Sequence, residues 1–201
     1  MKNIVLIIFL STSSLIAFSQ VKESVGGILS QEYSKEITEY KVKEFIVRDI
    51  LELPDNKIVE LEIDAITAAS SGEITTVIYR CKELNKSGIV FGFYNPYINE
   101  FNVKFNAYKF KNFDFEDAVT LLNKLDNVMD EKKSIIKLSN NDGYTKNAVY
   151  KHGDLIFIFY KGGIGANLIR VLWNDFDSEW NQMNLKATHR RFNQFFDIKK
   201  D

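Results

Sequence analysis

The sequence predicts an α+β fold in which largely antiparallel sheet is packed on one face by two helical segments. Residues 59–65 alternate between apolar and acidic side chains, and this period of two is typical of a strand with one wet face. Residues 114–130 and 178–197 instead repeat apolar side chains at helical spacing. Hydrophobic residues make up 45% of the chain, a fraction that excludes an intrinsically disordered protein.

The N-terminal residues have the pattern of a secretory signal peptide. A lysine precedes an apolar run over residues 4–10, and Ala17 and Ser19 are spaced like the small residues of a cleavage site. The apolar stretch is shorter than the roughly 20 residues of a spanning helix. We therefore expect residues 1–19 to be cleaved, and we expect no integral membrane span in the chain that remains.

The domain organisation follows from the residues after this signal. We expect residues 20–40 to be weakly structured and residues 41–201 to form a single α+β domain. The alternative is a division into two halves near residue 131. The one cysteine, Cys81, cannot form an internal disulfide, so an exported chain must derive its stability from its core.

The alternating residues from Val59 to Ala65 and the strand over residues 75–82 are expected to pair as a hairpin around the three-residue loop 70–72, with Ala69 opposite Glu73. The register that this loop imposes places Ala65 opposite Val77, Ile63 opposite Tyr79, Leu61 opposite Cys81, Glu62 opposite Arg80 and Glu60 opposite Lys82. A slip of one residue would place acidic side chains on the apolar face. The pairing makes Glu60, Glu62 and Asp64 a solvated strand face rather than a cation site, and it makes Cys81 a buried structural thiol.

Further strands are expected after this hairpin. Residues 89–94 would place Phe91 on the same core face as Val77. The alternation that begins at Phe101 changes parity at Tyr108, and we interpret this change as a bulge or as the end of a strand.

The second half of the chain also contains strand patterns. Residues 155–160 are apolar on both faces, which is typical of a central strand covered on both sides. A turn through His152 and Gly153 would pair this strand with residues 147–151, and residues 168–173 are expected to form the next strand.

Capping residues indicate where the two helices begin. Asp114 is expected to cap the first helix. The acids between Asp175 and Glu179 are expected to stabilise the positive end of the second helix. The apolar stripes of this second helix do not align, which indicates a kink near Asn184.

Three residues are candidates for ligand binding. Tyr94 and Tyr97 flank a turn outside the inward-facing set, and exposed aromatic rings near amides can stack on sugars or bases. Arg170 shares strand parity with Leu168 and Leu172, so it is either an inward charge that needs a partner or a side chain that reaches the sheet edge.

The sequence contains no signature of catalytic chemistry. Its two histidines, His152 and His189, have neither a nucleophile motif nor a zinc-ligand spacing around them. We therefore expect no catalytic residue, metal or cofactor, although scattered carboxylates leave enzyme activity open. A formal net charge of -1 argues against nucleic acid as a partner.

These observations predict an exported bacterial cell-envelope protein, periplasmic or extracellular. Its expected role is that of a non-catalytic binding or interaction module for an envelope component, a glycan or a lipid. Two alternatives remain: a hydrolase that uses carboxylates with His152 or His189, and a structural assembly subunit.

Overall fold

The protein is represented by a computed structural model that describes residues 37–66, 73–98, 101–102, 104–131, 146–162 and 166–198. All of these residues belong to one compact unit, Gln31–Asp201. The expected signal peptide and most of the expected lead segment lie outside the described residues. In the part of the chain that is described, no helix has the length and apolar character needed to cross a membrane.

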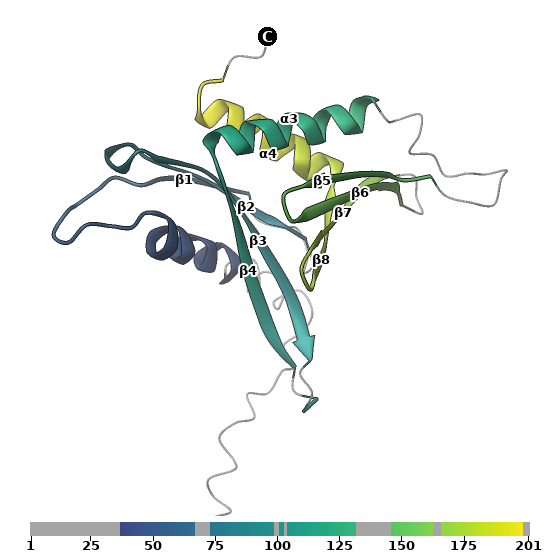
Figure 1. Ribbon diagram of the computed structural model, residues 1–201, viewed down its shortest axis with the longest axis horizontal. Helices are drawn as coiled ribbons and strands as arrows, with labels where there is room; N and C mark the ends of the chain where they lie inside the picture. The colour runs from purple at the N-terminus through teal and green to yellow at the C-terminus, as the bar shows by residue number, and fades with distance from the viewer. Residues whose placement is uncertain are drawn as a thin grey trace, which may run out of the picture. The chain divides into compact units, whose positions relative to one another are not determined.

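Two four-stranded antiparallel sheets and three helical segments make up the fold, so the predicted α+β class is confirmed (Figure 1). Sheet A contains β1 (Glu62–Ile66), β2 (Thr75–Cys81), β3 (Lys86–Ile98) and β4 (Lys104–Asp114), in that order. Sheet B contains β5 (Ala148–His152), β6 (Leu155–Lys161), β7 (Asn167–Trp173) and β8 (Phe176–Asn181), also in that order. One parallel bridge joins Glu73, just before β2, to Glu179 of β8.

The helices differ in number and bounds from the prediction. Helix α3 (Phe115–Glu131) matches the first predicted helix, whereas α4 (Gln182–Phe195) is shorter than the second. A further helix over residues 37–45 continues into a π-helical turn, η1 (Ile46–Ile50). This extra helix crosses the expected boundary between the lead segment and the domain, and its inward-facing residues Val42 and Ile46 are fully buried.

The predicted register of the β1–β2 hairpin is confirmed. Ala65 lies opposite Val77, and Glu62 lies opposite Arg80. The Arg80 guanidinium donates to the Glu62 carboxylate through Nε at 3.0 Å, while Lys82 contacts the same carboxylate at 3.3 Å rather than Glu60. The third acid, Asp64, is partly exposed and has its basic partner in α4, because Arg191 donates to it at 2.8 Å.

The expectation that Phe91 shares a face with Val77 is wrong. The turn after β2 is a short 3-10 helix, η2 (Lys82–Leu84), which ends at Asn85 with a positive φ of 51°. Strand β3 therefore begins earlier than expected, and Val90 rather than Phe91 lies opposite Val77. Because successive strand residues point to opposite faces, this shift places Phe91 on the other side of the sheet.

Sheet A is apolar on both faces, which also explains the parity change along β4. The strand pairs with β3 without interruption from Lys104 to Asp114, so the expected bulge is absent from this strand. On one face, Phe110 packs against Phe45 with ring centroids 5.2 Å apart. On the other face, Phe113 packs against Phe91 at 5.0 Å.

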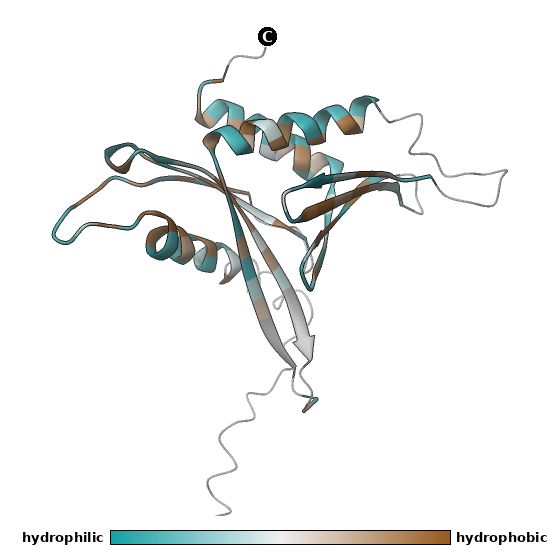
Figure 2. Ribbon diagram, in the orientation of Figure 1, coloured by the Kyte–Doolittle hydropathy of each residue, from teal (hydrophilic) through white to brown (hydrophobic). Residues whose placement is uncertain are grey.

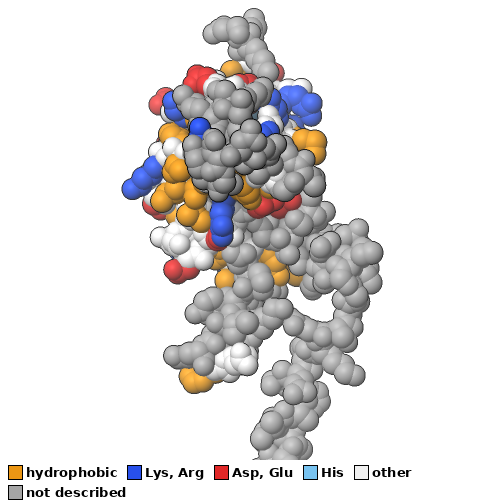
Figure 3. Space-filling view, turned by 90° about the vertical axis from the view of Figure 1, so that its right-hand side faces the viewer, with side chains coloured by type: hydrophobic (Ala, Val, Ile, Leu, Met, Phe, Trp, Pro, Cys, Tyr) orange, Lys and Arg blue, Asp and Glu red, His pale blue; other side chains and the backbone are white. Residues whose placement is uncertain are grey.

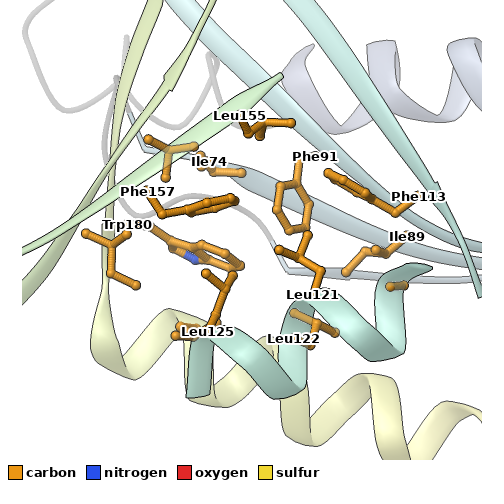
Figure 4. Packing of buried hydrophobic residues seen from close by; sticks show 14 of the residues in the cluster. Ile74, Ile89, Phe91, Phe113, Leu121, Leu122, Leu125, Leu155, Phe157 and Trp180 are labelled. Atoms are coloured by element: carbon orange, nitrogen blue, oxygen red, sulfur yellow. The ribbon is translucent and has the colours of Figure 1, made fainter. Parts of the chain in front are cut away.

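The main core lies between sheet A, sheet B, α3 and α4, and it includes the labelled residues of Figure 4. Trp180 of β8 packs edge-on against Phe91 with centroids 5.1 Å apart, and Leu121 and Leu125 of α3 belong to the same cluster. The two predicted helices thus cover the same side of sheet A. A second cluster, which includes Val42, lies on the opposite face.

The helix termini and hydropathy follow the physical expectations. The Asp117 backbone N–H donates to the Asp114 carboxylate at 2.9 Å, so the predicted cap of α3 is confirmed. Figure 2 shows hydrophilic and hydrophobic residues alternating around α3, whereas the ribbons of β6 and β7 are largely hydrophobic.

The expected helical start over residues 178–181 is wrong, because these residues belong to β8. Ser178 and Trp180 are buried while Asp177 and Glu179 are exposed, a period of two that indicates a strand. Helix α4 begins after Asn181, whose side chain accepts from the Asn184 backbone N–H at 2.8 Å. The mismatched apolar stripes therefore come from joining a strand to a helix.

We expect Gly88→Ala to destabilise the fold through β3 and β4. A Cβ atom at Gly88 would lie 2.1 Å from the carbonyl oxygen of Phe113, and a paired backbone cannot move away as a flexible side chain can. The free energy of unfolding should fall by about 1–3 kcal/mol, measured by urea denaturation. The neighbouring Ser87→Ala variant is the control, and equal stability of the two variants would contradict this packing.

Candidate functional site

The strand period of sheet B separates a buried face from an outer face. Leu155, Phe157 and Phe159 of β6 are fully buried in the main core. The alternate residues of β6, and the residues that lie beside them on β5, β7 and β8, point the other way. They define the outer face of sheet B: Val149, Lys151, Ile156, Ile158, Tyr160, Leu168, Arg170, Leu172, Asp177 and Glu179. This face contains five aliphatic side chains, and the Val149 residue is 66% exposed.

Charged groups border the aliphatic side chains on this outer face. The Arg170 guanidinium forms a two-point ion pair with Asp177, with Nε donating at 2.6 Å, and this pair holds the pKa of the Asp177 carboxyl below its ordinary value. The Tyr160 hydroxyl donates to Glu179 at 2.8 Å. Burial and the Glu179 carboxylate raise the pKa of Tyr160 to about 12, so this hydroxyl remains a donor at neutral pH.

The side of the molecule on which sheet B lies in Figure 1 is shown as a surface in Figure 3. Hydrophobic side chains reach the surface there among lysine, arginine and acidic side chains.

A second polar cluster lies where α3 begins. The His152 ring lies between two partners: its Nε2 is 2.8 Å from Asp117 Oδ1, and its Nδ1 is 3.1 Å from the Tyr150 hydroxyl. Burial, followed by the Asp117 charge, raises the pKa of Tyr150. In the tautomer with the proton on Nε2, the ring donates to Asp117 and accepts from the Tyr150 hydroxyl at Nδ1.

The β5–β6 turn places Asp154 beside this cluster. Gly153 adopts a φ of 58°, which a two-residue hairpin turn requires and which glycine adopts without strain. Asp154 accepts from the Lys111 ammonium at 2.6 Å and from the Trp173 indole N–H at 2.8 Å. These contacts join sheet A to both hairpins of sheet B.

The second histidine also contacts an acid of α3. His189 Nδ1 lies 3.2 Å from Asp126 Oδ2. Each histidine therefore has a carboxylate within hydrogen-bond reach, which is one of the two conditions of the hydrolase alternative; the other is a pocket around them. His189 is in α4, in a helical stretch as expected, whereas His152, expected in the turn, is the last residue of strand β5.

The three residues predicted to bind a ligand do not meet in one place. Tyr94 and Tyr97 are both in β3, which continues from Lys86 to Ile98, so the expectation that they flank a turn is wrong. Tyr94 is also not exposed as expected, because it is 9% exposed and its ring lies 5.1 Å from that of Tyr108. Arg170 belongs to the other sheet and points outward, so it reaches its partner Asp177 at the surface rather than inside. A role of these residues in binding stays a prediction.

Two features of the site were missed in the sequence. The outer face of sheet B was missed because β8 was taken for the start of a helix, although the alternation from Phe176 to Asn181 indicates it. The pairing of His152 with Asp117 joins residues far apart in the chain, and nothing in either local pattern indicates it.

The comparisons with known proteins assign neither a family nor a related structure. No family model matches the sequence, and neither the curated proteins nor the solved structures contain a match. Among the residues that the structure describes, no three or more His, Cys, Asp or Glu side chains are grouped to hold a metal ion.

We expect Asp154→Asn to weaken the pH dependence of stability. Hydrogen bonds from Lys111 and then Trp173 lower the pKa of Asp154. A carboxyl whose pKa is lower in the folded state than in the unfolded state stabilises the fold at every pH above its unfolded-state pKa. This contribution is lost as the pH falls through the folded-state pKa. The variant should lose about 0.2–1 kcal/mol at pH 7 and show a smaller further loss below about pH 4.

Urea denaturation between neutral and acidic pH measures this effect. The exposed Asp175→Asn in the β7–β8 turn is the matched control, and its curve should parallel that of the unsubstituted chain. A parallel curve for Asp154→Asn as well would contradict the account of this contact.

Proposed function

We propose that the protein is an exported interaction module of the bacterial cell envelope, and that it binds its partner through the outer face of sheet B. The observation that supports this proposal is the continuous placement of aliphatic side chains on that face. In the register of the sheet, Ile156 lies beside Leu172, and Ile158 lies on the next row of the same face.

Val149 is exposed, and the other four aliphatic residues of this face are partly exposed. Exposure of single apolar residues is ordinary, whereas several neighbouring ones on one sheet face are a feature of interaction sites. A strand exposed to water on one face normally alternates apolar and polar residues, whereas β6 is apolar at nearly every position. Burial of this face against a partner would remove aliphatic surface from water, at roughly 25 cal/mol per Å².

The charged rim supports a non-catalytic role. Arg170, Asp177, Tyr160 and Glu179 are held by one another at the surface, which fixes their positions before a partner arrives. Fixed rim charges contribute orientation and specificity to an interface. Export is supported by the sequence of residues 1–19, and a periplasmic or extracellular location follows from it.

We expect a photo-crosslinking amino acid at Val149 to label a discrete partner in an exporting host, while the same residue at Met183 does not. Met183 of α4 is a matched control because it is 79% exposed and belongs to a helix rather than to a strand of sheet B. Adding Ile156→Glu should abolish the Val149 adduct, because a carboxylate would be buried without a partner. Mass spectrometry of the adducts is the measurement.

Equal labelling from Val149 and Met183, or an adduct that survives Ile156→Glu, would contradict the proposal. So would the absence of any adduct from Val149 in a host that exports the folded chain.

A further inference from the structure

We propose that the partner of the outer face of sheet B is a second copy of this chain, related by a twofold axis parallel to the strands. This inference rests on the proposed function, because it names the partner for the same surface. The order of charges across the sheet supports it.

The register aligns four outer side chains in one row across sheet B. Lys151 of β5 lies opposite Ile156, Ile156 lies opposite Leu172, and Leu172 lies opposite Asp177 of β8. The row therefore has a cation at one edge, two aliphatic side chains at its centre and a carboxylate at the other edge. Lys151 and Asp177 are both exposed.

Such a row is complementary to itself. A twofold axis between β6 and β7 exchanges β5 of one copy with β8 of the other, and it exchanges β6 with β7. Lys151 then faces Asp177 of the second copy, and Ile156 faces Leu172 of the second copy. Because a twofold interface uses the same patch on both subunits, each contact occurs twice.

The neighbouring rows add both apolar and charged groups to the face, because Arg170 lies in one of them. Tyr160 lies opposite Leu168 in register, and Ile158 lies opposite Arg170. Two sheets that pack face to face lie about 10 Å apart, which suits aliphatic side chains of this size. Asp177 is already oriented by Arg170 of its own chain, so binding a second cation requires little further ordering.

The size of the face determines the strength of this contact. Four strands spaced about 4.8 Å apart, with about six residues each at ~3.3 Å per residue, span an area on the order of 400 Å². Standard stable interfaces bury about 800 Å² per partner. The dimer should therefore be reversible and depend on protein concentration.

Sedimentation of the chain purified from an exporting host tests this inference. The unsubstituted chain is expected to convert from monomer to dimer with rising concentration. Lys151→Glu, which places a carboxylate opposite Asp177 of the second copy, should weaken the dimer by about tenfold or more. Lys124→Glu is the matched control, because it makes the same charge change on an exposed position of α3 and should leave the dimer unchanged.

Cysteine cross-linking tests the orientation. A bismaleimide of about 8 Å should join a Lys151→Cys chain to an Asp177→Cys chain when the two are mixed, because the sheets are about 10 Å apart. Lys151→Cys alone should give no product, since the axis places the two copies of β5 at opposite edges. The native Cys81 is fully buried, so it does not compete.

A chain that stays monomeric at every concentration overturns the inference, and so does a dimer that Lys151→Glu leaves intact. Linkage of Lys151→Cys to itself, without the mixed product, overturns the twofold arrangement. These failures can be distinguished from failure of the proposed function. If the chain is monomeric and the cross-linker at Val149 labels a different molecule, the proposed function stands and the second copy is excluded. If the cross-linker at Val149 labels nothing, both proposals are excluded.

Discussion

The indole of Trp180 packs edge-on against Phe91, and through this contact the two sheets bury one common core. Phe93 of sheet A makes a similar contact with Trp173 of sheet B, with ring centroids 5.1 Å apart. The single cysteine is buried and unpaired, so no internal disulfide holds the sheets together. Apolar burial must therefore supply most of the stability of the fold.

The two sheets differ in how many of their faces are covered. Sheet A is covered on both faces, by the helix that contains Val42 on one side and by the main core on the other. Sheet B contributes only its inner face to the core, and its outer face keeps Val149 and Arg170 at the surface. Because of this asymmetry, the outer face of sheet B is the surface that we propose for a partner.

Local pairing was predictable from the sequence, whereas the coverage of each face was not. The hairpin register followed because Glu62 and Arg80 on one face agree with the apolar residues on the other. The face on which Phe91 lies depends on where one short turn ends, and a shift of one residue reverses it. Asp177 was assigned to a helix start because acidic residues are common both at helix starts and on exposed strand faces. As a consequence, its ion pair with Arg170 was not predicted.

The common core predicts that the sheets unfold together. Both tryptophans belong to sheet B, so their fluorescence follows that sheet, while far-ultraviolet circular dichroism follows the whole backbone. The most direct test is a urea titration of the exported chain with both signals. Coincident transitions are the predicted result. A fluorescence transition that is complete while much of the dichroism remains would show that sheet B unfolds independently, and would contradict a shared core.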